Sequence, residues 1–194
     1  ANPEGRFIVI AGIAGLLAGA FSMGAGEFVS VTSQRELFER QIALEKEELE
    51  SNPEEERREL ALIYRAKGLP VEEAEALSTR ILADSGVALE TLAREELGLN
   101  PEGLGSPWGV ALSSFAAFAA GAIIPVVPWF FGSSAPFFIA SVAMGAVAMF
   151  AVGAAVSLFT GRNFAFAGGR QLGIGMSAAA VTFGIGKLIG AQTG

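Results

Sequence analysis

Residues 7–31 read FIVIAGIAGLLAGAFSMGAGEFVSV, and the only charged side chain among them is Glu27. A helix needs about 20 apolar residues to cross the roughly 30 Å hydrocarbon core of a bilayer. The stretch is therefore long enough and apolar enough to span a membrane. Because backbone polar groups inside a bilayer must be satisfied within the segment, a spanning stretch of this kind is predicted to be an α-helix.

Three more stretches have the same character. Trp108–Phe131 and Ala135–Thr160 contain no charge, and Gln171–Gly190 contains only Lys187, near its end, where a long side chain can reach the interface. No stretch alternates apolar and polar residues over a useful length, so strands are not predicted. The expected fold is all-α: a polytopic membrane helical bundle with four spans.

The charges are concentrated in one part of the chain. Of 194 residues 52% are hydrophobic and only 17% are charged, against roughly 25% in a soluble domain. Residues 32–106 hold 9 of the 13 Lys and Arg and 18 of the 20 Asp and Glu, a local net charge of 9 − 18 = −9. We therefore expect three parts: a first span within residues 1–31, an acidic water-soluble insertion at 32–106, and three further spans within 107–194.

Cysteine and histidine are both absent. This excludes disulfide scaffolds, thiolate zinc sites, His-ligated haem and the usual nucleophile–histidine catalytic sets. An enzyme is therefore not expected. A pI near 4.7 argues against nucleic acid as a partner and favours cations.

The loops predict the orientation. If each apolar stretch crosses once, the insertion and the 161–170 loop, which contains Arg162 and Arg170, lie on the same side. Lys and Arg mark the cytoplasmic side of a membrane protein. We therefore expect the acidic insertion to face the cytoplasm.

The insertion is predicted to be helical throughout. The first span continues as a helix to about Glu50, and Ser51-Asn52-Pro53 then begins a second helix that ends before Gly68. Pro70 begins a third helix, which runs to about Leu82. Asp84 or Ser85 caps a last helix that ends at Gly98.

Several glutamate pairs in the insertion are three residues apart, so that each pair lies on one helix face. Two such pairs on facing helices could hold Mg, Ca, Mn or ferrous iron, but a solvated acidic face explains the same spacing. Two sets with intervals of 3, 8 and 3 residues fit equally well. They are Glu36, Glu39, Glu47 and Glu50, or Glu45, Glu48, Glu56 and Glu59.

Met23 and Glu27 lie one helical turn apart near the end of the first span. A carboxylate at the edge of a bilayer is costly unless it faces water, a cavity or a partner. One interpretation is an ion path past the Met23 thioether and the Glu27 carboxylate. The other places Glu27 among the headgroups and Met23 in ordinary packing.

The motif FSMGAGEFVSV at 21–31, followed by Ser33-Gln34-Arg35, resembles the signature of the vacuolar iron transporter family, and so does AREELGL at 93–99. The resemblance covers essentially the whole chain. It implies proton-coupled export of ferrous iron (Fe2+), with Mn2+ as a second candidate, by a homodimer in the lipid bilayer. For a bacterial member it implies the inner (plasma) membrane. It also implies a metal-gathering set of glutamates, Glu45, Glu48, Glu56, Glu59 and Glu96, and a membrane-embedded methionine, Met23.

The sequence departs from the family pattern in two places. Leu92 and Ala93 stand where plant members have methionines. The family is also expected to have five spans, the first with an Asp-containing motif that is not found here, and residues 1–6 resemble the loop after it. We therefore expect a chain without that span. A metal-binding and dimerisation module without transport activity is the alternative function.

Overall fold

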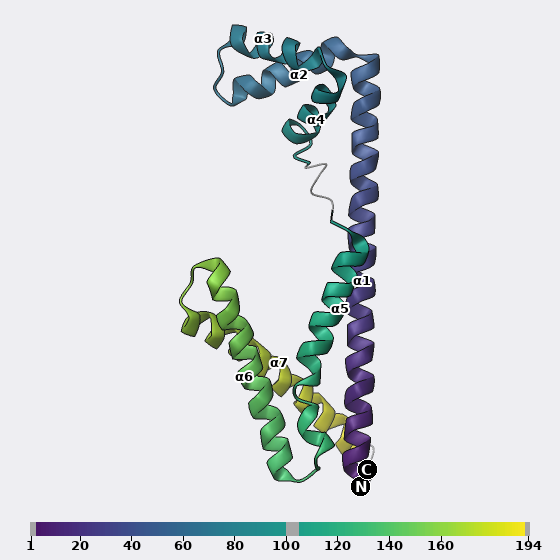
Figure 1. The fold of residues 1–194 in the computed structure, drawn as a ribbon, viewed down its shortest axis with the longest axis vertical. Helices are drawn as coiled ribbons and strands as arrows, with labels where there is room; N and C mark the ends of the chain where they lie inside the picture. Colours follow the sequence, from purple (N-terminus) through teal and green to yellow (C-terminus); the bar gives the residue numbers. More distant parts are fainter. Residues whose placement is uncertain (1–2, 100–104, 193–194) are drawn as a thin grey trace. The chain divides into compact units, whose positions relative to one another are not determined.

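The computed structural model describes residues 3–99 and 105–192, and within them it is helical with no strand (Figure 1). This confirms the expected all-helical class. The elements are α1 (Pro3–Ser51), α2 (Pro53–Ala66), α3 (Val71–Leu82), α4 (Ser85–Glu95), α5 (Pro107–Ile123), the 3-10 helix η2 (Val127–Phe130), α6 (Ala135–Thr160) and α7 (Phe164–Gln192).

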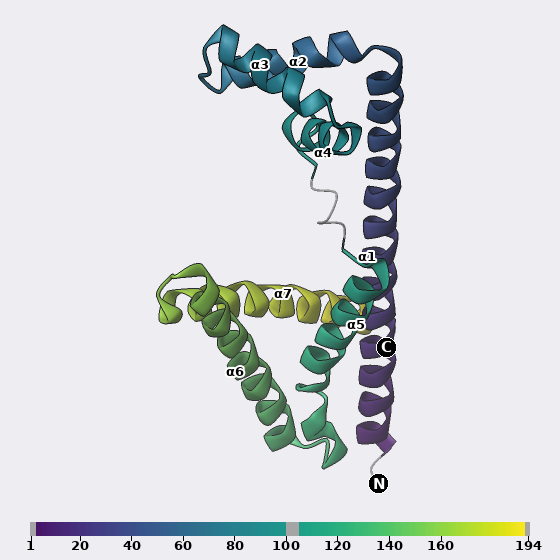
Figure 2. The ribbon, with the colours of Figure 1, turned by 45° about the horizontal axis from the view of Figure 1, so that its top comes forward.

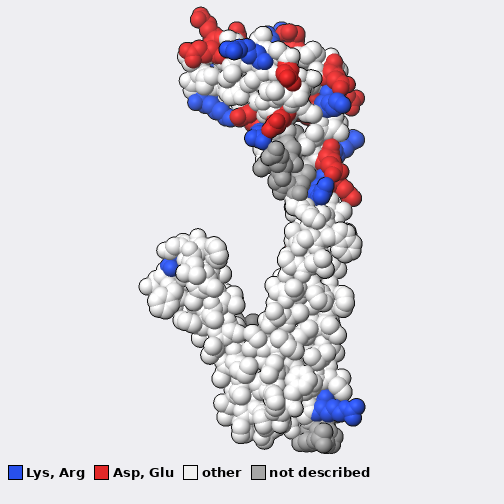
Figure 3. Space-filling model, viewed as in Figure 1, with Lys and Arg blue, Asp and Glu red and all other residues white. Residues whose placement is uncertain are grey.

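The described residues divide into two compact units. Gly24–Ser113 contains α2, α3, α4, the second half of α1 and the start of α5, and we call it the acidic unit. The remaining described residues form the apolar unit. Charged side chains gather over the acidic unit, while the visible surface of the apolar unit is almost entirely uncharged (Figure 3).

Three helices, α1, α6 and α7, are long and apolar enough to cross a membrane. The remaining expected span, Trp108–Phe131, was predicted too long. Here α5 ends at Ile123, and η2 follows it. Pro125 and Pro128 lie in this segment and have no backbone N–H to donate, so an uninterrupted α-helix is disfavoured there.

The α6–α7 hairpin in the apolar unit is closely packed. An added Cβ at Gly153 would lie 2.6 Å from the Ala167 carbonyl oxygen and 2.9 Å from the Gly168 Cα. The 161–170 loop expected from the sequence is shorter in the structure, since α7 already begins at Phe164. The Asn163 side chain accepts hydrogen bonds from the amides of residues 165 and 166 and so starts the helix early.

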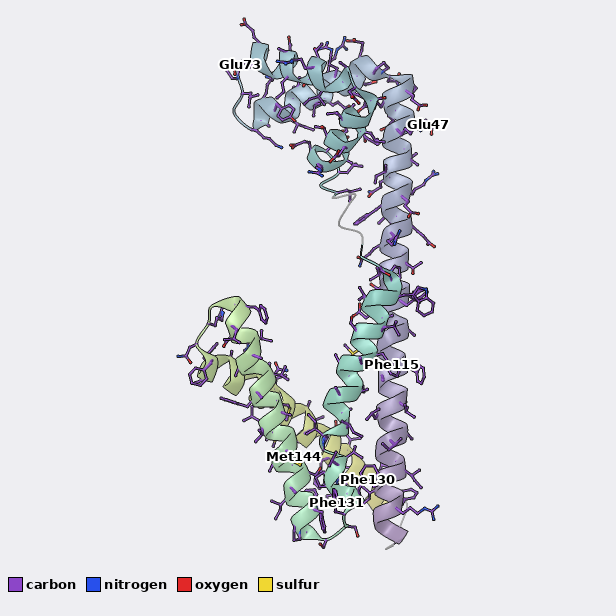
Figure 4. All side chains as sticks on the ribbon, viewed as in Figure 1. Glu47, Glu73, Phe115, Phe130, Phe131 and Met144 are labelled. Carbon is purple, nitrogen blue, oxygen red and sulfur yellow. The ribbon has the colours of Figure 1, made fainter. Side chains whose placement is uncertain are left out.

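Aromatic contacts also join α1 and α5. Phe21 meets Phe115 edge-on at 5.1 Å between ring centroids, within the apolar unit (Figure 4). Phe28 meets Trp108 at 4.8 Å, within the acidic unit. Such pairs contribute about 0.5–1.5 kcal/mol beyond the area they bury.

In the acidic unit α2, α3 and α4 pack on one another near the end of α1 (Figures 1 and 2). Their core is small. Leu60 of α2, Leu92 and Ala88 of α4, and Ala74 of α3 are all fully buried. Burying each leucine contributes about 1.5–3 kcal/mol. The small alanines let the helices approach closely, and this brings side chains on their inner faces together.

The two ends of α4 are fixed by local hydrogen bonds. At its start the Asp84 carboxylate accepts from the amides of Gly86 and Val87, at 2.9 and 3.2 Å. This confirms the expected cap. Beyond its end the Leu99 amide donates to the Ala93 carbonyl oxygen at 2.8 Å, across Gly98 with φ +64°. A left-handed φ favours glycine, so this turn follows from the sequence.

Candidate metal centre

Three carboxylates from three helices meet inside the acidic unit. Glu45 lies in α1, Glu56 in the first turn of α2, and Glu96 at the C-terminal cap of α4. One carboxylate oxygen of each lies within 4.8 Å of the others. We call these three residues the carboxylate cluster. Like charges at this spacing repel, so an uncompensated cluster is costly to keep ionised.

Glu45 and Glu56 are buried, with 2% and 5% of their surface exposed, whereas Glu96 is exposed. The Oε1 atom of Glu45 and the Oε2 atom of Glu56 are inaccessible to solvent and have no hydrogen-bond partner in the part of the chain that the structure describes. Buried polar atoms without partners cost free energy unless a ligand or ion satisfies them. The exposed Glu96 gives the cluster a side that solvent can reach.

The electrostatics of the cluster follow from this burial. Burial raises the pKa of Glu45 from 4.5 to about 8, and the charges of Glu96 and Glu56, a side-chain hydrogen bond with Glu56 and the charge of Glu48 act in the same direction. Burial also raises the pKa of Glu56, although a side-chain hydrogen bond with Glu45 acts in the opposite direction there. Burial, followed by the charges of Glu59 and Glu48, raises the pKa of Glu96.

Glu48 and Glu59 lie close enough to act on the carboxylate cluster. Both are exposed, and their charges help to raise the pKa of its members: Glu48 acts on Glu45, Glu56 and Glu96, and Glu59 acts on Glu56 and Glu96. The structure therefore brings all five glutamates named from the family resemblance into one neighbourhood.

Five of the nine Lys and Arg residues of the acidic unit pair with other glutamates. The ion pairs are Arg35–Glu39 (3.7 Å), Lys46–Glu50 (3.8 Å), Arg57–Glu54 (3.2 Å), Arg94–Glu90 (2.7 Å) and Lys67–Glu95. Within residues 3–99 and 105–192, neither the three glutamates of the carboxylate cluster nor Glu48 and Glu59 have an ion-pair partner. Their negative charge is left available to a cation from outside the chain.

The alternative set of glutamates has a different environment. Glu39 and Glu50 are ion-paired, and Glu36 and Glu47 are exposed. Glu47 lies on the side of α1 that faces away from α2–α4 (Figure 4). The two sets have identical spacing along the chain, but only the set beginning at Glu45 faces the other helices of the acidic unit.

The chemistry of the cluster suits a hard or borderline divalent cation. All five side chains offer carboxylate oxygens, which Mg, Ca, Mn and ferrous iron accept. No thioether or imidazole lies among them, since Leu92 and Ala93 stand at the positions of the plant methionines and the chain has no histidine. The donor set is therefore all oxygen.

Met23 and Glu27 lie outside the cluster. Met23 is 45% exposed and Glu27 is half-buried, and both lie in α1. Glu27 precedes Glu45 by 18 residues of continuous helix, which is about 27 Å along its axis. An ion held by the cluster cannot touch Glu27 at the same time.

One feature of the site was not anticipated from the sequence. The bonded turn after α4, from Ala93 to Leu99, anchors the chain just beyond Glu96 and so fixes where its carboxylate lies. Gly98 indicates this turn in the sequence, but it predicts only where the helix ends and not the position of Glu96.

Comparison with known proteins shows a sequence similarity over most of the chain. The family model of the VIT family matches residues 1–187. The chain is 37% identical over 126 residues to "Vacuolar iron transporter" of Acanthamoeba castellanii, covering 65% of this chain and 47% of that protein. It is 30% identical to "Vacuolar iron transporter 2" of Oryza sativa subsp. japonica, covering 97% of this chain and 77% of that protein.

A third relative is "Vacuolar iron transporter 1" of Arabidopsis thaliana, 30% identical over 66% of this chain and 52% of that protein. The chain thus spans about half the length of the Acanthamoeba and Arabidopsis proteins. The family match extends over nearly all of the residues, and the apolar helices are those of an integral membrane protein. The chain belongs to the VIT family.

Proposed function

We propose that this chain transports ferrous iron, with Mn2+ as a second substrate, out of the cytoplasm in exchange for protons. In this proposal the acidic unit faces the cytoplasm, and Glu45, Glu48, Glu56, Glu59 and Glu96 gather the metal there. The chain acts as a homodimer in the bacterial inner membrane. The family membership and the relatives named as iron transporters support iron as the substrate.

The observation that carries the proposal is the environment of the carboxylate cluster. Among the described residues, the carboxyl groups of Glu45 and Glu56 are buried without an ion-paired cation, and one oxygen of each has no hydrogen-bond partner. A solvated acidic face would leave such groups exposed or paired, as it does Glu39 and Glu50. A divalent cation would satisfy the orphan oxygens and neutralise the repulsion among the carboxylates.

Proton coupling follows from the same groups. A carboxyl must lose its proton before it can bind metal, so metal uptake at the cluster releases protons. With the pKa of Glu45 at about 8, that residue is protonated in much of the apo protein near neutral pH. Metal and proton therefore compete for one set of oxygens.

Met23 and Glu27 are proposed to line the route into the membrane. Glu27 is the only acidic residue within the apolar stretch 7–31, and Met23 offers a soft thioether one helical turn away. An isolated carboxylate in this position is costly unless it faces water or an ion.

Flux through proteoliposomes tests the proposal. The full chain is reconstituted with an internal divalent-metal indicator and an acidic lumen, and Mn2+ or anaerobic Fe2+ is added outside. We expect uptake that depends on the pH gradient and that falls at least tenfold in Glu27→Gln. The matched control Glu36→Gln, an exposed glutamate of the same helix, retains wild-type flux.

Wild-type flux in Glu27→Gln would contradict the proposed route. Metal binding by the wild-type chain without any flux would instead identify it as a metal-binding module, the alternative function.

A further inference from the structure

The acidic unit also contains a pocket of the opposite charge. A cavity of about 340 Å³ between α2 and α3 is lined by Arg57, Arg58, Ala61, Leu62, Arg65 and Glu75. The two helices pack side by side in both ribbon views (Figures 1 and 2). Three arginines against one glutamate is unexpected in an insertion whose net charge is −9.

The arginines gather because of their spacing on α2. Arg58 and Arg65 are seven residues apart, two helical turns, and therefore lie on one face. Arg65 lies about 180° around the helix from Glu56. Thus α2 presents glutamates to the carboxylate cluster on one side and arginines to the pocket on the other. The small, buried Ala61 between them leaves room for the hollow.

Two of the three guanidinium groups could bind an anion. Arg57 donates to the Glu54 carboxylate at 3.2 Å and is largely neutralised by it. Among the described residues, Arg58 and Arg65 have no ion pair, although Glu75 lies in the same lining. Two unpaired guanidinium groups facing one concavity form a site for an anion, since each can donate two parallel hydrogen bonds to phosphate oxygens.

We propose that this pocket binds a phosphate-bearing anion through Arg58 and Arg65. A volume of about 340 Å³ suits a small ligand rather than a protein segment. The apolar part of the lining, Ala61 and Leu62, accommodates the uncharged part of such a ligand. The anion is either a soluble phosphate compound or the headgroup of an anionic lipid, which present the same chemistry. This site is separate from the carboxylate cluster and does not rest on the transport proposal.

Calorimetric titration with pyrophosphate tests the site, using the full chain in phosphatidylcholine nanodiscs without divalent metal. We expect saturable binding that weakens as salt is raised. The double variant Arg58→Gln/Arg65→Gln should lower the affinity at least about tenfold, as expected for lost charge-assisted hydrogen bonds. Arg58→Lys/Arg65→Lys keeps the charge but loses the planar guanidinium group. Its affinity should lie between those of the wild type and Arg58→Gln/Arg65→Gln.

The matched control is Arg40→Gln/Arg80→Gln. Both arginines are exposed, lie outside the lining of the pocket and have no ion pair among the described residues, so this variant should change the affinity less than twofold. Repeating the titration in phosphatidylglycerol nanodiscs identifies the source. Weaker pyrophosphate binding there means that lipid headgroups compete for the site, and unchanged binding means a soluble anion. The absence of saturable pyrophosphate binding, or equal binding by Arg58→Gln/Arg65→Gln, would overturn the proposal.

Discussion

Glu45 has a costly environment for a charged group, because it is 2% exposed and lies close to other carboxylates. Its pKa rises from 4.5 to about 8, so the folded state binds a proton more tightly than the unfolded state does. The stability contributed by this proton is fully present below pH 4.5 and is lost as the pH rises through about 8. In the apo protein, the cluster therefore destabilises the acidic unit at alkaline pH.

We predict that Glu45→Gln stabilises the metal-free acidic unit at pH 8 by about 1–3 kcal/mol, because it removes a buried charge. At pH 5 the difference should be much smaller, since the wild-type group is then protonated. Hydrogen exchange of the α2 and α4 amides measures this locally. The exposed Glu47→Gln serves as the control and should change protection little at either pH. Equal protection of Glu45→Gln and wild type at pH 8 would contradict the account of the cluster.

Metal affinity should depend on pH with a definite sign. Between about pH 4.5 and 8 the metal must displace the proton on Glu45, so the affinity rises with pH, by up to about tenfold per unit for one displaced proton. Titrating Mn2+ at pH 6, 7 and 8 measures this slope. Glu45→Gln should show a shallower slope together with weaker binding. A pH-independent affinity in the wild-type chain would show that these carboxyls do not bind the metal.

Close helix packing in the apolar unit depends on glycine at particular positions. Gly153→Ala forces α6 away from the α7 backbone, and overpacking of this kind costs about 1–3 kcal/mol. Gly145→Ala on the same helix meets only Pro125, at 3.9 Å, so it should be neutral. Thermal unfolding in detergent should therefore show a lower Tm for Gly153→Ala alone. Equal Tm values for the two variants would contradict the packing described for the hairpin.

The helices themselves differ in how well the sequence predicts them. Every helix of the acidic unit was predicted within a few residues, because Pro53, Gly68, Asp84 and Gly98 mark its boundaries with specific backbone requirements. In the apolar unit α5 was predicted too long and α7 too short at its start. Hydropathy does not change across these boundaries. Pro125 and Pro128 disfavour a longer α5, and the Asn163 cap begins α7.

At the scale of the whole molecule, the spacing of the glutamates could not select the site. Two sets with identical intervals fitted the sequence, and the choice between them came from a family resemblance. The structure distinguishes the two sets. Among the described residues, Glu45 and Glu56 are buried and have no ion-pair partner, whereas Glu39 and Glu50 are ion-paired. Burial and pairing depend on how α1, α2 and α4 pack, which no periodicity in one segment reveals.

The same limit applies to the arginines of α2. In the sequence, Arg57 and Arg58 are indistinguishable from cations that balance a solvated acidic face. The structure shows that Arg57 is paired and that Arg58 faces a hollow against α3. The acidic unit thus has a carboxylate cluster, proposed to bind cations, and an arginine-lined pocket, proposed to bind anions, on opposite sides of α2.

Calorimetric titration of Mn2+ into the full chain at pH 7.5 tests the central claim most directly. It compares wild type with the two fourfold Glu→Gln variants that have the same spacing and the same loss of charge. Substitution of Glu45, Glu48, Glu56 and Glu59 is predicted to weaken binding at least tenfold, and substitution of Glu36, Glu39, Glu47 and Glu50 to change it less than threefold. Equal affinities of the two variants, or a greater loss in the second, would contradict the assignment of the metal centre.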